Sequence, residues 1–124
     1  MANPTRTEKL TARLRALQAS TPEIDGAALI SPDGLAIAAV LAPPIDEDRV
    51  AAMSAAMLSL GERIAAELGR GQMEQVYVKG STGYALLTAA GPQAVLTVIA
   101  HKDIRLGLLL LELRKVVADL QSLL

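Results

Sequence analysis

Residue types that carry most enzyme chemistry are scarce in this sequence. His101 is the only histidine, and there is no cysteine among the 124 residues. No nucleophile lies near His101 along the chain, so a solvated loop histidine is favoured over a general base. The lack of cysteine excludes a thiolate metal site, a disulfide framework and a cysteine nucleophile.

Two other stretches have the composition of a site. The carboxylates of residues 46–48 precede a helical pattern, so helix capping explains them, although two-carboxylate catalysis stays open. Residues 79–83 read Lys-Gly-Ser-Thr-Gly, but they join two expected strands, whereas a phosphate-binding P-loop opens a helix. No metal-ligand spacing is present. The sequence therefore predicts no catalytic residue, no metal, no cofactor and no enzyme.

Composition indicates one domain, over residues 1–124, with an apolar excess. Hydrophobic residues make up 52% of the chain, and 12 Lys and Arg balance 13 Asp and Glu, with neither Phe nor Trp. This composition argues against a nucleic-acid-binding protein, which needs an excess of basic residues and aromatic side chains that stack on bases. The first ten residues lack the apolar core of a signal peptide, and the longest apolar runs are too short to cross a bilayer. We expect a cytoplasmic protein that does not insert into membranes, with some apolar surface covered by another chain.

The apolar patterns and turn residues predict eight elements. Helices are expected at 5–19, 46–68 and 104–124, and strands at 26–31, 35–41, 74–79, 84–90 and 94–100. Pro32-Asp33-Gly34 predicts a hairpin turn. Residues 95–99 are apolar on both faces of their strand, so helices must cover both sides of the sheet. The fold class is α/β, a three-layer α-β-α sandwich around one central five-stranded antiparallel sheet, in the order α-β-β-α-β-β-β-α. Helix 46–68 is expected on one face of it and the other two helices on the opposite face.

The helix at 46–68 carries two contrasting stripes. The larger residues share one side and are expected to form core: Val50, Met53, Met57, Leu60, Ile64 and Leu68. The opposite side carries small residues: Ala52, Ala55, Ser59 and Ala66, with Glu62 between them. Alanine is the best helix former, which is one explanation of this stripe. A flat face on which a partner docks is the other, and the apolar excess favours it.

The helix at 104–124 also has two interpretations. Leucine and valine recur at alternating spacings of three and four, as in a coiled-coil seam. Further leucines widen that seam, which favours burial on the sheet beside the first helix.

Three motifs resemble those of the roadblock family. Residues 26–35 match its opening strand, Asp-Gly turn and second strand; Ala55-Ala56-Met57 lies in the middle helix; and Leu106-Gly107 begins the last helix, where Arg105 replaces the family's frequent Asn. The whole chain is then one roadblock domain with a roadblock/longin-like fold. Among bacterial members it is most similar to the MglB-type regulators of the Ras-like GTPase MglA, which links it to gliding motility and cell polarity.

That resemblance implies a homodimer that activates a Ras-like small GTPase (MglA-like). Two sheets would join edge to edge through the strands at 74–79, and the middle helices would pair and reposition the switch loops of the GTPase. The implied dimer-interface residues are Glu74, Val76, Tyr77, Val78 and Ala66. The implied partner-binding residues are Ala52, Ala55, Ala56, Ser59 and Arg63. A dimeric roadblock adaptor or scaffold that leaves hydrolysis unchanged is the alternative, and a small-molecule sensor is a weaker one.

Overall fold

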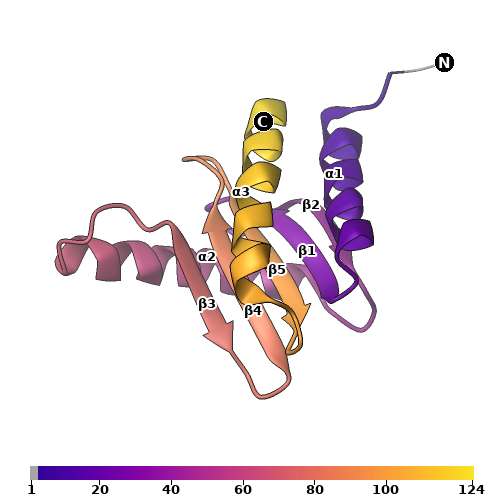
Figure 1. Cartoon of the computed structure of the whole chain (residues 1–124). Coiled ribbons are helices and arrows are strands. Elements are labelled where there is room, and N and C mark those ends of the chain that lie inside the picture. Colours follow the sequence, from indigo (N-terminus) through magenta and orange to yellow (C-terminus); the bar gives the residue numbers. More distant parts are fainter. Residues whose placement is uncertain (1–2) are drawn as a thin grey trace.

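The computed structural model describes residues 3–124, which form five strands and three helices in the predicted order (Figure 1). The elements are α1 (Arg6–Ser20), β1 (Ile24–Ile30), β2 (Ala36–Leu41), α2 (Glu47–Glu67), β3 (Gln75–Lys79), β4 (Gly83–Ala89), β5 (Val95–His101) and α3 (Leu106–Leu123). All strand pairs are antiparallel, and the strand order across the sheet is β2-β1-β5-β4-β3. The predicted fold class is confirmed.

Local sequence signals explain several element boundaries. The Thr5 hydroxyl accepts a hydrogen bond from the Glu8 N–H and caps α1, and the Asp46 carboxylate accepts from the N–H groups of Asp48 and Arg49 and caps α2. Gly34 turns the first hairpin with a φ of +88°, a conformation that favours glycine. Asp103 directly precedes the expected start of the last helix, and its residue type would suit a helix cap, but it does not cap α3. Asp103 lies 3.2 Å from the His101 ring instead, and α3 begins at Leu106 without a side-chain cap.

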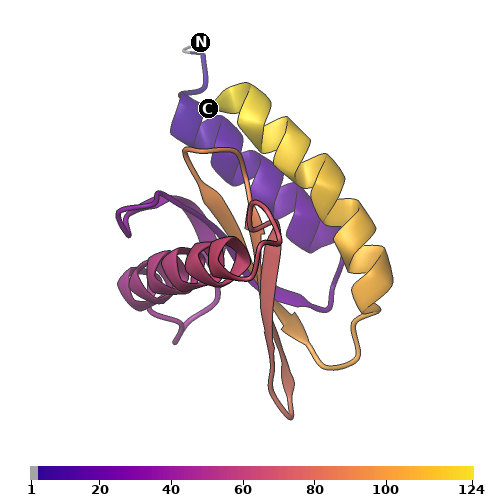
Figure 2. The same cartoon turned by 90° about the vertical axis from the view of Figure 1, so that its left-hand side faces the viewer.

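Figure 2 shows helices on both faces of the sheet, and an apolar core lies between the sheet and the helices on each face. On one face, α1 and α3 bury Leu14, Leu17, Leu113 and Leu120 against the sheet. This confirms that α3 packs on the sheet beside α1 rather than forming a free coiled-coil seam. On the other face α2 covers a smaller core. The two-sided burial of β1 and β5 follows from these layers.

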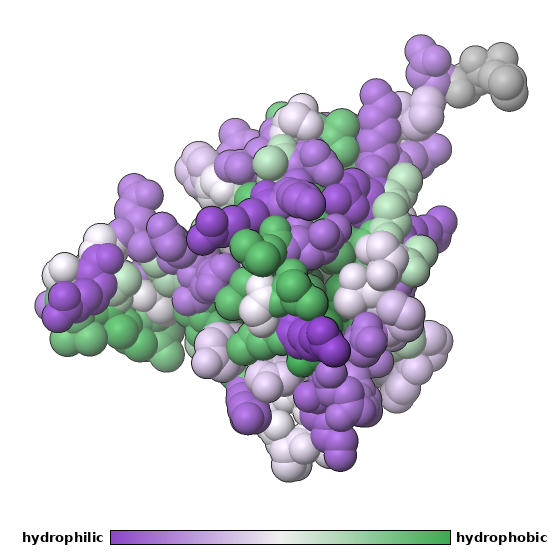
Figure 3. All heavy atoms as spheres, viewed as in Figure 1, coloured by the Kyte–Doolittle hydropathy of each residue, from purple (hydrophilic) through white to green (hydrophobic). Residues whose placement is uncertain are grey.

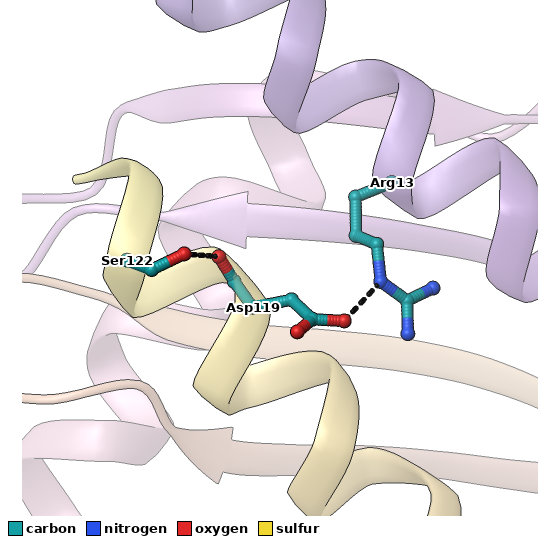
Figure 4. Close-up of polar contacts among 3 residues, drawn as sticks. All are labelled: Arg13, Asp119 and Ser122. Carbon is teal, nitrogen blue, oxygen red and sulfur yellow. Dashed lines mark hydrogen bonds and ion pairs between the residues drawn. The ribbon is translucent and has the colours of Figure 1, made fainter.

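An ion pair joins the two helices that share one face. The Arg13 Nε of α1 donates to Asp119 Oδ2 of α3 at 2.8 Å, and the Ser122 hydroxyl bonds the Asp119 carbonyl oxygen at 2.7 Å (Figure 4). The Asp119 side chain is more than half exposed. Water therefore screens the pair, and it contributes little to stability.

Helix α2 is longer than the sheet is wide. Its 21 residues span about 31 Å at 1.5 Å per residue, and it contacts β2, β1, β5 and β3. Five strands spaced by about 4.8 Å are only about 19 Å across. In Figure 1 the C-terminal part of α2 consequently projects beyond β3, the edge strand.

Between residues 3 and 124, no helix combines the length and the apolar character needed to cross a membrane.

Candidate partner-binding and dimerisation surfaces

The side of α2 that faces the sheet is not the one the sequence pattern indicated. Of the expected core stripe only Val50 is buried, and Met57 is partly buried. The remaining four residues form an exposed apolar stripe: Met53 is 63%, Leu60 53%, Ile64 51% and Leu68 65% exposed. The prediction that this stripe is core is therefore wrong.

Small residues bring α2 close to the sheet. The buried residues of the helix are Val50, Ala51, Ser54, Leu58 and Gly61. At Gly61 a Cβ atom would lie 2.8 Å from Val76 Cγ2 and 3.1 Å from Met73 Cγ, so a larger residue would push the helix away from β3. The buried side of α2 is therefore the one whose small residues let the helix backbone lie close to the sheet, and not the one with the largest apolar side chains.

One buried hydrogen bond fixes the rotation of α2 about its own axis. The hydroxyl groups of Ser54 and Thr97 lie 2.7 Å apart, and both residues are less than 5% exposed. A hydrogen bond has a narrow range of favourable geometry, whereas apolar contacts do not. This pair joins α2 to β5, near the middle of the sheet.

The predicted partner-binding residues lie on the side of α2 that points away from the sheet, which we name the outer face. It comprises Ala52, Ala55, Ala56, Ser59 and Arg63. At 100° per residue, the centre of this face lies about 120° around the helix from the centre of the exposed apolar stripe. Each is exposed except Ala55, which is half-buried. The two surfaces are neighbours and do not overlap.

Ala55 lies where α2 meets the first hairpin. A Cβ atom built on Gly34 would be 3.6 Å from the Ala55 Cβ, which is ordinary van der Waals contact. A groove runs beside it, lined by Ala55, Ser59, Pro32 and Pro92 among others. The outer face therefore continues into a concave surface formed with the β1–β2 and β4–β5 turns.

Charged groups on the outer face are well exposed. Arg63 Nη2 lies 3.9 Å from Glu67 Oε1, one helical turn away, and both side chains are about three-quarters exposed. Such a pair is weak, so Arg63 is free to change partners.

The predicted dimer-interface residues lie along β3 and on the projecting end of α2. Tyr77 is 53% and Val78 49% exposed, whereas Val76 is partly buried against α2. Ala66 is exposed on α2. Glu74 precedes the strand, and its carbonyl oxygen accepts a hydrogen bond from the Ala89 N–H. Among residues 3–124, no strand pairs with the outer side of β3.

The exposed apolar stripe was missed as a candidate surface. A groove lies between the end of α2 and β3, lined by Ile64, Leu68, Met73 and Val76 among others. In Figure 3 hydrophobic surface follows the projecting end of α2. The apolar excess of the composition was the available signal, because it predicted surface left over for another chain.

The described residues bring no catalytic group together. His101 pairs with Asp103 at an exposed loop, and residues 3–124 contain no cluster of three or more His, Cys, Asp or Glu residues that could hold a metal ion. What the arrangement offers is a set of contact surfaces.

Comparisons with known proteins agree with this architecture. Residues 10–100 match the model of the Roadblock/LC7 domain. The uncharacterized protein MJ1340 of Methanocaldococcus jannaschii is 32% identical over 103 residues, which cover 83% of this chain and 90% of that protein. A Roadblock/LC7 domain from Streptomyces avermitilis has a TM-score of 0.85 at 25% identity, covering 90% of this chain and 94% of that one. Myxococcus xanthus MglB has a TM-score of 0.86 at 22% identity, covering 92% and 93%. The chain therefore belongs to the Roadblock/LC7 domain family.

Proposed function

We propose that this chain is a homodimeric regulator that binds a Ras-like small GTPase of the MglA type and accelerates its GTP hydrolysis. The observation that carries the proposal is the division of α2 into two neighbouring surfaces, the exposed apolar stripe and the outer face. The first suits a second copy of the chain, and the second suits a different protein.

The dimer is supported by apolar surface gathered at one edge of the molecule. Leu60, Ile64 and Leu68 lie next to the free β3 edge, where Tyr77 and Val78 are about half exposed. Burying about half of each such side chain contributes roughly 1 kcal/mol per residue in each protomer. A second copy would cover both the projecting helix and the unpaired strand.

The outer face is suited to close contact with another backbone. Ala52, Ala56 and Ser59 lose little side-chain entropy when a partner covers them. In the dimer, two copies of this face would stand side by side and form a single platform. Myxococcus xanthus MglB has a similar fold at 22% identity.

The regulator acts by shifting the population of GTPase conformations. A dimer that binds only the GTP-ordered switch loops stabilises that state by its differential affinity for the two states. The GTPase's own residues then position water and neutralise charge on the transferred phosphoryl group. Arg63 remains outside the GTPase active site in this scheme, and the chain itself makes and breaks no bond.

The test is single-turnover phosphate release from an MglA-type GTPase with and without the protein. We expect acceleration by the wild type and none by Ser59→Arg, because an arginine would hold the two surfaces apart. Ala118→Arg is the matched control, since Ala118 is exposed on α3 across the sheet. Arg63→Ala should reduce the maximal rate less than tenfold.

Each contrary result has a definite meaning. Tight binding without faster hydrolysis would replace the regulator with the adaptor or scaffold alternative. A tenfold or greater loss in Arg63→Ala would indicate that the chain supplies an arginine to the active site. Equal activity of Ser59→Arg and wild type would remove the outer face as the binding surface.

A further inference from the structure

The register in which two β3 strands join can be read from the free edge of a single strand. Resting on the proposed homodimer, we infer that the strands pair antiparallel about a twofold axis that passes through Tyr77. Backbone direction and side-chain pairing support this register independently.

Backbone direction along β3 follows from two hydrogen bonds at its ends. The Ala89 N–H donates to the Glu74 carbonyl at 3.0 Å, and the Gly80 N–H donates to the Gly83 carbonyl at 2.8 Å. Glu74 and Gly80 thus direct backbone groups toward β4, and because this direction alternates along a strand, Val76 and Val78 do the same.

The intervening residues present their backbone to the free edge. These are Gln75, Tyr77 and Lys79, each with one unpaired N–H and one unpaired C=O directed away from β4. A symmetric strand pair must form its hydrogen bonds through these residues alone. Only a small set of registers is therefore compatible with the edge.

The register centred on Tyr77 forms hydrogen bonds with the backbone of all three outward-facing residues. Tyr77 then pairs with the partner's Tyr77, and Gln75 pairs with the partner's Lys79, so every outward N–H and C=O of the strand is bonded. A twofold axis through Val76 pairs Gln75 with the partner's Tyr77 and leaves Lys79 outside. An axis through Val78 leaves Gln75 outside in the same way. Each outward group left unbonded in the interface costs stability.

The side-chain pairs across the interface also favour a twofold axis through Tyr77. On the α2 face it places Val76 opposite the partner's Val78, a β-branched pair of the kind that stabilises sheets. On the other face the two Tyr77 rings meet, each already 6.3 Å from Tyr84 of its own chain. The axis through Val76 would instead set Val78 opposite the partner's Glu74, an apolar side chain against a carboxylate. The axis through Val78 would set Val76 opposite the partner's Gly80, which has no side chain to pack.

Disulfide trapping tests the register, because the natural chain has no cysteine. Val76 and the partner's Val78 would form a non-hydrogen-bonded pair with Cα atoms about 4.5 Å apart, within disulfide range. Val76 and the partner's Val76 would be offset by two residues and lie about 8 Å apart, which is too far.

The experiment uses Val76→Cys, Val78→Cys and Tyr77→Cys, each produced alone, and the first two also coproduced. After mild oxidation, we expect a covalent dimer from coproduced Val76→Cys and Val78→Cys, and from Tyr77→Cys alone. Neither valine variant alone should form one. Ala118→Cys, exposed on α3, measures random cross-linking, and circular dichroism with light scattering verifies folding and the dimer.

Failure of the register and failure of the dimer give different results. Covalent dimer from Val76→Cys alone or from Val78→Cys alone would overturn the Tyr77 axis in favour of a shifted one. A dimer in light scattering that none of the variants traps would overturn pairing through β3. A monomer at micromolar concentration for the wild-type chain would overturn the homodimer itself.

Discussion

Replacing Leu60 by alanine should weaken the proposed dimer without unfolding the protomer. Leu60 is 53% exposed on α2, one residue before Gly61, which packs against Val76 of β3. Full burial of a leucine side chain is worth about 1.5–3 kcal/mol, so about half of that remains to be gained when a second copy covers it. The substitution is present in both protomers, and the expected loss is therefore about 1.5–3 kcal/mol per dimer. At 1.4 kcal/mol per tenfold, the dimer dissociation constant should rise about 10- to 100-fold.

Sedimentation equilibrium over a dilution series measures this constant directly. Leu111→Ala is the matched control, because Leu111 is 59% exposed, is also helical, and lies on α3 across the sheet. Alanine is a good helix former at both positions, so neither substitution should weaken its helix. We expect the dissociation constant of the control to equal that of the wild type. Circular dichroism should show that the Leu60→Ala protomer stays folded.

Two results would refute the reasoning. If Leu60→Ala left the dissociation constant unchanged, the exposed apolar stripe would lie outside the contact between protomers. If Leu111→Ala weakened the dimer as much, the effect would come from general loss of apolar surface, and the position on α2 would be irrelevant.

The remaining predictions concern the stability of the protomer. Thr97→Val should lower the free energy of unfolding by about 1 kcal/mol or more in urea denaturation, because the buried Ser54 hydroxyl loses its partner, and adding Ser54→Ala should recover most of that loss. Thr88→Val is the matched control, because the buried Thr88 hydroxyl finds no hydrogen-bond partner within the described residues 3–124, so its removal should not destabilise the protomer. A loss of stability equal to that of Thr97→Val would contradict the role of the Ser54 bond. A double-mutant cycle on Arg13 and Asp119 should give a coupling below about 1 kcal/mol that falls at high salt; a larger, salt-independent value would mean that the pair is not screened by water.

Short-range signals were sufficient for the elements of this fold. Asp46 and Thr5 begin helices because their side chains satisfy free backbone N–H groups, and Gly34 turns a hairpin because it tolerates positive φ. The apolar residues on both faces of β5 predicted helices on both sides of the sheet. The caps and the turn depend only on residues that are close together in the chain. The two-sided burial of β5 requires only that some helix covers each face of the sheet.

The start of α3 and the burial of α2 did not follow from such signals. Asp103 has the right type for a cap, but its side chain lies against His101, and the helix begins two residues beyond the predicted position. Helix capping depends on the local backbone path, which the loop after β5 determines. Residue type alone does not contain that information.

By itself, the sequence determined the order of the elements, the three layers and the presence of more apolar surface than one small domain can bury. Only the tertiary structure decided where that surplus lies. Hydrophobic periodicity indicates which residues avoid water, but not whether their own chain or another one covers them. Here α2 is longer than the sheet is wide and approaches it through Ser54 and Gly61, so Leu60, Ile64 and Leu68 stay exposed beside β3.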